Sequence, residues 1–267
     1  MATLPRQAIV VGISGCSSSG KTTLSRLLRD IFPNTFVLHE DDFYRPETEL
    51  PKKHDLLDWD CAESLDIPAM VKSLEHIRRD GTFPLTLSLQ PDLDSKEDQN
   101  SLGECPVPDT TIEALKARAK TWAEPGHPGY GILNSSPTPI RLCIFDGFLL
   151  YSKSMEPIQA KMDIKLFLRV SYAKAKARRE ARSGYVTLEG FWADPPGYVD
   201  KIVWPNYVED HAWMFENGDV EGDLKEDVVK EWDIKTHEGG VDVDMTTTLQ
   251  WAVDTLMEQL PVVAKSS

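Results

Sequence analysis

The segment GCSSSGKT at residues 15–22 decides the fold of this 267-residue chain. It follows the apolar run AIVVGI at residues 8–13 and leads into residues 22–31, where apolar side chains recur at helical spacing. A continuous β-branched run is typical of a strand buried on both faces of a parallel sheet. Glycines between such a strand and a helix let backbone N–H groups turn toward phosphate oxygens at the positive end of the helix. The segment therefore predicts a phosphate-binding loop, in which Lys21 reaches the outer phosphates and Thr22 holds Mg²⁺. The residues expected to contact a nucleotide here are Gly15, Cys16, Ser17, Ser18, Ser19, Gly20, Lys21, Thr22 and Thr23.

The rest of the sequence alternates between strand and helix patterns. Further strands are expected at residues 35–39, 141–145 and 164–170, and helices at 22–31, 171–182 and 245–260. Such alternation favours an α/β fold with a parallel sheet. Together with the loop, it predicts a three-layer fold of the P-loop NTPase type, with residues 1–267 forming one domain.

Two segments interrupt the alternation. Residues 81–139 hold many prolines, an acidic run and one modest helical patch at 111–122, so we expect an irregular peripheral insertion there. Residues 178–205 begin with arginines and continue into a stretch rich in aromatic residues, proline and glycine. Many large aromatic side chains in an irregular segment indicate a lid and substrate loop.

Composition and charge narrow the range of partners. The chain has 29 basic and 43 acidic residues, a formal net charge of −14, and a field of that sign disfavours nucleic acid and anionic membranes. The first long apolar run is too short for a signal peptide or a membrane span. The four cysteines lack metal-ligand spacing and are expected to be reduced thiols. We therefore expect a cytoplasmic protein that acts on a small molecule and needs no obligate protein partner.

Carboxylates follow two of the expected strands. Asp41 and Asp42 come after residues 35–39, and Asp146 ends the apolar run CIFD. Because the carboxyl ends of parallel strands share one edge of the sheet, these side chains are expected beside the phosphate loop. A carboxylate there can accept a proton from an attacking hydroxyl or hold Mg²⁺, as phosphoryl transfer requires. Aspartates that only cap a turn are the alternative. The absence of an N/T-K-x-D motif argues against a GTPase.

Several segments resemble the nicotinamide riboside kinases, especially the fungal ones, within the uridine kinase-like nucleoside kinases. The segments that carry the resemblance are GISGCSSSGKTTL, HEDDFY, LLDWD, IFDGFLLY, the cluster Arg178, Arg179 and Arg182, and PPGYVDKIVWPNY. The resemblance implies an ATP- and Mg²⁺-dependent kinase that phosphorylates the 5′-hydroxyl of nicotinamide riboside. The product would be nicotinamide mononucleotide for NAD synthesis, and nicotinic acid riboside is expected as a second substrate.

The resemblance also implies roles for individual residues. Asp41 is expected to be the catalytic carboxylate, assisted by Lys21 and Arg178, and Mg²⁺ to lie near Thr22, Asp41 and Asp146. Arg178 and Arg182, with Val243 and Asp244 before the last helix, would contact ATP. The residues expected to bind the nucleoside are Asp41, Asp42, Phe43, Tyr44, Trp59, Asp60, Arg179 and Tyr185.

Within that set, Asp60 would accept hydrogen bonds from the ribose hydroxyls. Trp59 would stack on the pyridinium ring, which suits an indole face through a cation–π contact. Tyr185 is the first choice for the second aromatic residue that stacks on the ring, with Phe191 and Trp192 as alternatives. The choice stays open because residues 186–192 depart from the short animal form of the family.

Two other functions fit the same motifs. A uridine or cytidine kinase would carry out the same reaction on a different base. A regulatory protein that binds a nucleotide without catalysis would need neither Lys21 nor Asp41 nor Asp146, and the presence of all three argues against it.

Overall fold

The buried run at the start of the chain becomes the central strand of a parallel sheet. The computed structural model describes residues 6–84, 104–134, 139–182, 184–187 and 190–265. In these residues five parallel strands form the main sheet in the order β2-β5-β1-β6-β9. Their bounds are β1 Ala8–Ser14, β2 Thr35–His39, β5 Arg141–Gly147, β6 Ile164–Phe167 and β9 Ile234–Thr236.

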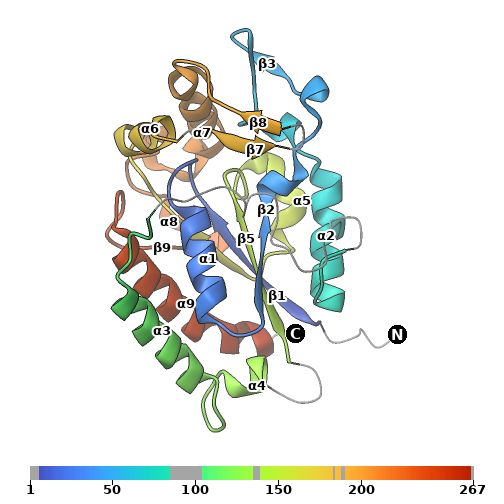
Figure 1. The fold of residues 1–267 in the computed structure, drawn as a ribbon, viewed down its shortest axis with the longest axis vertical. Helices are drawn as coiled ribbons and strands as arrows, with labels where there is room; N and C mark the ends of the chain where they lie inside the picture. Colours follow the sequence, from blue (N-terminus) through green and yellow to red (C-terminus); the bar gives the residue numbers. More distant parts are fainter. Residues whose placement is uncertain (1–5, 85–103, 135–138, 183, 188–189, 266–267) are drawn as a thin grey trace.

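Helices cover both faces of this sheet and give the three-layer architecture (Figure 1). Alternate residues of β1 point to opposite faces, as a strand requires, so Ile9 packs into one apolar core and Val10 into the other. The Ile9 face is covered by α1 (Lys21–Ile31), α3 (Asp109–Trp122), α4 (Tyr130–Leu133) and α9 (Met245–Lys265). The Val10 face is covered by α2 (Ile67–Asp80) and α5 (Glu156–Gln159). The expected α/β fold of P-loop type is confirmed.

Smaller elements gather near the carboxyl ends of the strands, at the top of Figure 1. They are the hairpins β3 (Lys52–Lys53) with β4 (Leu56–Leu57) and β7 (Tyr185–Thr187) with β8 (Gly190–Trp192), and the helices α6 (Tyr172–Glu180) and α7 (Trp204–His211). A π-helical turn, Val199–Val203, leads into α7, and α8 (Glu226–Trp232) precedes β9. These elements bring residues from distant parts of the sequence to one edge of the sheet.

The predicted strands and helices are confirmed with small shifts at their ends. One strand is shorter than expected, because β6 stops at Phe167 rather than at residue 170. The Leu168 N–H still donates to the Ser14 carbonyl (2.8 Å). The Arg169 carbonyl, however, accepts from the backbone N–H of Asp242 and not from a residue of a neighbouring strand. The chain leaves the sheet at that point and starts α6 at its N-cap, Ser171.

The helical patch expected at residues 111–122 is present as α3. Its buried residues Leu115, Ala119 and Trp122 belong to the same apolar core as α1 and α9. The described part of residues 81–139 therefore contributes to the core. Among the described residues, no helix has the length and apolar character needed to cross a membrane.

Candidate active site

The phosphate-binding loop joins β1 to α1, and two glycines shape it. Gly15 has φ 148°, and a Cβ atom there would lie 2.3 Å from the Leu168 carbonyl oxygen. Gly20 has φ 102° and a Cβ there would lie 2.5 Å from the Met245 methyl group. The positive φ disfavours a side chain at both positions, and at Gly15 the Leu168 backbone also leaves no space for one. The glycines thus let the loop curl tightly ahead of the amino terminus of α1, where unpaired backbone N–H groups favour an anion.

Lys21 lies inside the loop. Its ammonium group is buried and donates to the Cys16 carbonyl at 3.0 Å. Burial lowers the pKa of Lys21, while the charges of Asp146 and Asp41 act in the opposite direction. Because burial disfavours the charged form of Lys21, phosphate oxygens that accept charge-assisted hydrogen bonds from it would stabilise the ammonium group.

Other atoms around the loop fit phosphate and a metal ion. The hydroxyls of Ser18 and Ser19 and the second carboxylate oxygen of Asp146 are buried with no hydrogen-bond partner in the described structure. Buried polar atoms without partners are rare in native proteins and often mark a ligand site. Thr22 and Thr23 lie half-buried in the first turn of α1. The loop therefore has donors for phosphate and oxygen ligands suitable for Mg²⁺.

The expected metal site is not a cage made by the protein alone. Among the described residues, no three His, Cys, Asp or Glu side chains form a group able to hold a metal ion. Mg²⁺ commonly keeps several water ligands and takes only one or two carboxylates together with substrate phosphates. A single Thr hydroxyl with Asp146 and Asp41 agrees with that pattern.

Asp41 and Asp42 lie in the 3-10 turn Glu40–Phe43 directly after β2. The Asp42 carboxylate accepts from the His39 N–H at 3.3 Å, so this aspartate does cap the turn. Burial raises the pKa of Asp42 to about 6. Burial and the nearby Asp146 carboxylate raise the pKa of Asp41, and the charges of Lys21, His39 and Arg179 oppose that rise. Asp41 thus lies within the electrostatic field of the phosphate loop.

Asp146 lies at the end of β5, the strand between β1 and β2. It is paired in register with Ile13 on one side and His39 on the other. The His39 Nδ1 atom forms a buried, short contact with the first Asp146 carboxylate oxygen. His39 therefore fixes one oxygen of Asp146, while the other oxygen has no hydrogen-bond partner in the described structure. Sequence analysis did not anticipate this contact.

Glu40 is a second residue that sequence analysis missed. Its carboxylate is fully buried and accepts from the N–H groups of Phe148 and Leu149 at 2.6 and 3.1 Å. Burial and the charge of Asp41 raise its pKa to about 8. Glu40 ties the turn that carries Asp41 to the chain after β5, so the two acidic segments are held together.

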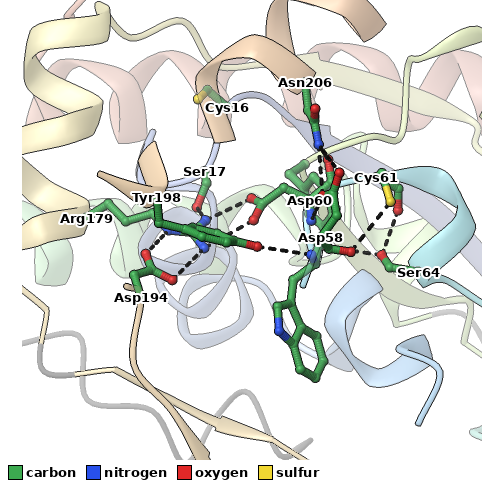
Figure 2. A network of polar contacts seen from close by, with 12 residues as sticks. Cys16, Ser17, Asp58, Asp60, Cys61, Ser64, Arg179, Asp194, Tyr198 and Asn206 are labelled. Atoms are coloured by element: carbon green, nitrogen blue, oxygen red, sulfur yellow. Dashed lines mark hydrogen bonds and ion pairs between the residues drawn. The ribbon is translucent and has the colours of Figure 1, made fainter. Parts of the chain in front are cut away.

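Asp60 and Arg179 form a buried two-point ion pair across the site. Arg179 Nη1 lies 2.8 Å from Asp60 Oδ1 and Nη2 lies 3.2 Å from Oδ2. Arg179 Nη1 also donates to the Ser17 hydroxyl of the phosphate loop at 2.8 Å. Burial raises the pKa of Asp60 to about 6, although Arg179 opposes the rise. Figure 2 shows Arg179 between Asp60 and Asp194, with Ser17 beside it.

Aromatic side chains surround Trp59 next to this ion pair. Its ring meets Tyr44 edge-on at 5.2 Å and lies 5.6 Å from the Trp192 ring at a tilt of 51°. The backbone N–H of Trp59 donates to the Tyr198 hydroxyl at 3.0 Å. Phe43, expected at the substrate, is buried in the apolar core. The cluster gives the site an apolar wall on the side of Asp60.

The remaining expected residues lie in three places. Arg178 on α6 donates to the Ser18 carbonyl at 3.2 Å, so it reaches the phosphate loop. Arg182 is exposed beyond the end of α6. Val243 is half-buried, and exposed Asp244 caps α9 by accepting from Thr247 N at 3.0 Å. Tyr185 lies in β7, and its side chain, like that of Phe191, falls outside the described side chains.

Two further polar residues contact the residues around Asp60 and Arg179. Asn206 on α7 donates to both Asp58 oxygens at 2.9 Å and to the Asp60 carbonyl at 3.0 Å. Asp194 accepts from Arg179 Nε at 2.6 Å. Asn206 belongs to the segment VWPNY, and that segment was the available signal for it; no sequence feature marked Asp194.

Several known proteins are similar to this chain over most of its length. No protein-family model matches it. The nicotinamide riboside kinase of Schizosaccharomyces pombe is 36% identical over 257 residues, covering 96% of this chain and 100% of that protein. The nicotinamide riboside kinase of Saccharomyces cerevisiae is 32% identical over 255 residues, covering 95% and 97%. Nicotinamide riboside kinase 1 of Homo sapiens is 26% identical over 204 residues, covering 76% of each chain.

These similarities span nearly the whole chain in the two yeasts. The expected resemblance is confirmed. The chain belongs to the nicotinamide riboside kinase family.

Proposed function

We propose that this protein transfers the terminal phosphoryl group of ATP to the 5′-hydroxyl of nicotinamide riboside, with Mg²⁺, and so makes nicotinamide mononucleotide. One observation carries the proposal beyond family membership. Arg179 Nη1 donates both to Ser17 of the phosphate loop and to Asp60 at the aromatic wall. A single guanidinium thus joins the phosphate site to a site whose carboxylate suits a sugar diol. Nicotinic acid riboside is proposed as a second substrate.

The phosphate loop would bind the phosphates of ATP. Lys21 and the N–H groups at the start of α1 offer positive charge, and Arg178 adds a guanidinium at Ser18. Val243, Asp244 and Arg182 are proposed to contact the rest of the nucleotide. Thr22, Asp41 and Asp146 would hold Mg²⁺, which supplies charge that offsets the negative phosphate oxygens.

Asp41 is proposed to accept the proton of the 5′-hydroxyl. A carboxylate beside the phosphate loop can take up that proton as a general base. The reaction needs little covalent chemistry from the protein, so most of the rate would come from positioning and from stabilising charge. Lys21 and Arg178 would stabilise the charge on the transferred group.

Asp60 and Trp59 are proposed to recognise the nucleoside. A carboxylate offers about four lone-pair positions, and Arg179 uses one on each Asp60 oxygen. The others can accept from the two ribose hydroxyls. The indole of Trp59, with Tyr44 beside it, offers a face that attracts a cationic pyridinium ring. Tyr185 remains proposed as a second stacking residue.

Residues 1–267 would form one kinase domain that acts in the cytoplasm, with residues 178–205 as its lid and substrate loop.

Product analysis tests the proposal. The protein is incubated with ATP, Mg²⁺ and nicotinamide riboside, and the product is examined by mass spectrometry and ³¹P NMR. We expect one added phosphoryl group, with the phosphorus coupled to the 5′ methylene protons. The control is Asp41→Asn, which should give little product in the same time. Release of ADP without a phosphorylated nucleoside, or phosphate on another hydroxyl, would contradict the proposal.

A further inference from the structure

Asp194 connects three parts of the nucleoside site. Its Oδ2 accepts from Arg179 Nε at 2.6 Å and its Oδ1 accepts from Arg179 Nη2 at 3.2 Å. Oδ1 also accepts from the indole N–H of Trp192 at 3.0 Å. One carboxylate thus contacts the arginine on α6 and the aromatic residue at the end of β8 (Figure 2 for Asp194 and Arg179).

The contact with Asp194 determines which way the guanidinium of Arg179 faces. A guanidinium is a planar fork with donors along fixed edges. Asp194 takes the edge formed by Nε and Nη2, and this leaves the edge formed by Nη1 and Nη2 toward Asp60 and Ser17. The side chain of Arg179 is 7% exposed and that of Asp60 is 5% exposed, whereas Asp194 is 18% exposed. Asp194 therefore braces the buried pair from its outer side.

The second contact of Asp194 sets the position of an aromatic residue. The Trp192 ring lies 5.6 Å from Trp59 and 6.1 Å from Tyr198. Because Trp192 and Arg179 share the Oδ1 atom of Asp194, a change in that carboxylate disturbs both the ring wall and the ribose-binding pair. Neither of these two contacts of Asp194 involves a residue of the phosphate-binding loop. Asp194 is linked to that loop through Arg179, which donates to the Ser17 hydroxyl.

We propose that Asp194 is a positioning residue for the nucleoside: it fixes Arg179 against Asp60 and aligns Trp192 beside Trp59. The inference rests on the proposed function, since it assigns these four residues to nucleoside binding. It predicts that loss of the Asp194 charge weakens nucleoside binding and leaves ATP binding nearly unchanged.

The first test compares Asp194→Asn with a matched control, Asp233→Asn. Asp233 also pairs with a cation, Lys235, at 2.6 Å, but its side chain is 69% exposed and it lies directly after α8, outside residues 178–205. For Asp194→Asn we expect KM for nicotinamide riboside to rise about tenfold, the scale of one charge-assisted hydrogen bond. KM for ATP should stay within about twofold. Asp233→Asn should change neither constant by more than about twofold. An unchanged nucleoside KM in Asp194→Asn, or equal rises in both KM values, would overturn the inference.

A double-mutant cycle tests whether Asp194 acts through Arg179. In an Arg179→Gln background, adding Asp194→Asn should change kcat/KM for the nucleoside less than about twofold further. Full additivity of the two losses would show that Asp194 acts independently and would overturn the inference. Thermal unfolding of each variant shows whether it is folded. If Arg179→Gln does not fold, Trp192→Phe replaces it as the second member of the cycle, with the same non-additive result expected.

The outcomes separate this inference from the proposed function. If the wild-type protein does not phosphorylate nicotinamide riboside, the proposed function is wrong. If the wild-type protein does so and Asp194→Asn has wild-type constants, only the role of Asp194 is wrong.

Discussion

The guanidinium of Arg179 and the carboxylate of Asp60 make a buried two-point contact, with N–O distances of 2.8 and 3.2 Å. The two residues are 119 positions apart in the sequence. A buried charge is costly without a partner, so each of these groups stabilises the other before any substrate arrives. The site proposed for the ribose is therefore preformed.

Replacement of Asp60 should affect all nucleosides alike. Asp60→Ala removes the acceptor proposed for the ribose hydroxyls, which nicotinamide riboside and uridine share. We expect kcat/KM to fall roughly 10- to 100-fold for both, the scale of hydrogen bonds to a charged group. Steady-state kinetics on the two nucleosides check this. A loss confined to one of them would place Asp60 at the base instead of the ribose.

Asp41→Asn should separate catalysis from folding. The substitution removes a carboxylate whose pKa is raised by burial and by Asp146, so the folded protein without ligands should be at least as stable as the wild type. The kcat should fall at least about a hundredfold, the usual scale for a lost general base. Thermal unfolding and single-turnover kinetics measure the two effects. Near wild-type turnover would remove Asp41 from the mechanism.

Trp59→Leu tests recognition of the pyridinium ring. Leucine keeps apolar bulk but lacks the ring quadrupole that attracts a cation. A cation–π contact of ~1–2 kcal/mol corresponds to a loss in kcat/KM of roughly five- to thirtyfold for nicotinamide riboside. Uridine is neutral and should lose less. Equal losses on both nucleosides would leave ring stacking by Trp59 without support.

His211 should make stability depend on pH. It is fully buried, its Nδ1 donates to the Tyr207 carbonyl at 3.0 Å, and burial lowers its pKa to about 4. The unfolded chain binds a proton at this residue near pH 6.5, so His211 contributes stability above that pH and loses it as the pH falls toward 4. His211→Phe removes this dependence. As the pH is lowered from 7.5 to 5, the free energy of unfolding of the variant should therefore rise by about 2 kcal/mol relative to that of the wild type.

Chemical denaturation of both proteins at the two pH values measures that change. The comparison within one pair of proteins is needed because carboxylates with raised pKa values, such as Asp42, shift stability in the opposite direction over the same range. If the difference in free energy of unfolding between the two proteins stayed constant with pH, His211 could not be neutral and buried in the folded protein.

Local patterns in the sequence predicted the centre of the fold. The β-branched run of β1, the glycines of the loop and the apolar spacing of α1 act through neighbouring residues, so they can be recognised without tertiary information. Helix α2 was missed although its signals are present. Asp66 caps it by accepting from Ala69 N at 3.0 Å, proline stands in its first turn, and Gly81 ends it with φ 70°.

The site was predictable only in part. Asp41 and Asp146 follow apolar strands, and parallel strands bring their ends together. The partners of Asp60 could not be predicted in this way, because Arg179 and Asn206 come from helices far along the chain and meet it only through tertiary packing.

The short strand β9 was not predicted either. It pairs with β6 over three residues, too few for a periodic pattern.

Substrate preference is the most direct test of the central claim. ADP release is measured with ATP and Mg²⁺ for nicotinamide riboside, nicotinic acid riboside, uridine and cytidine, and kcat/KM is compared. We expect the highest kcat/KM for nicotinamide riboside, with nicotinic acid riboside also accepted and both pyrimidine nucleosides much poorer. A higher kcat/KM for uridine or cytidine than for nicotinamide riboside would contradict this expectation.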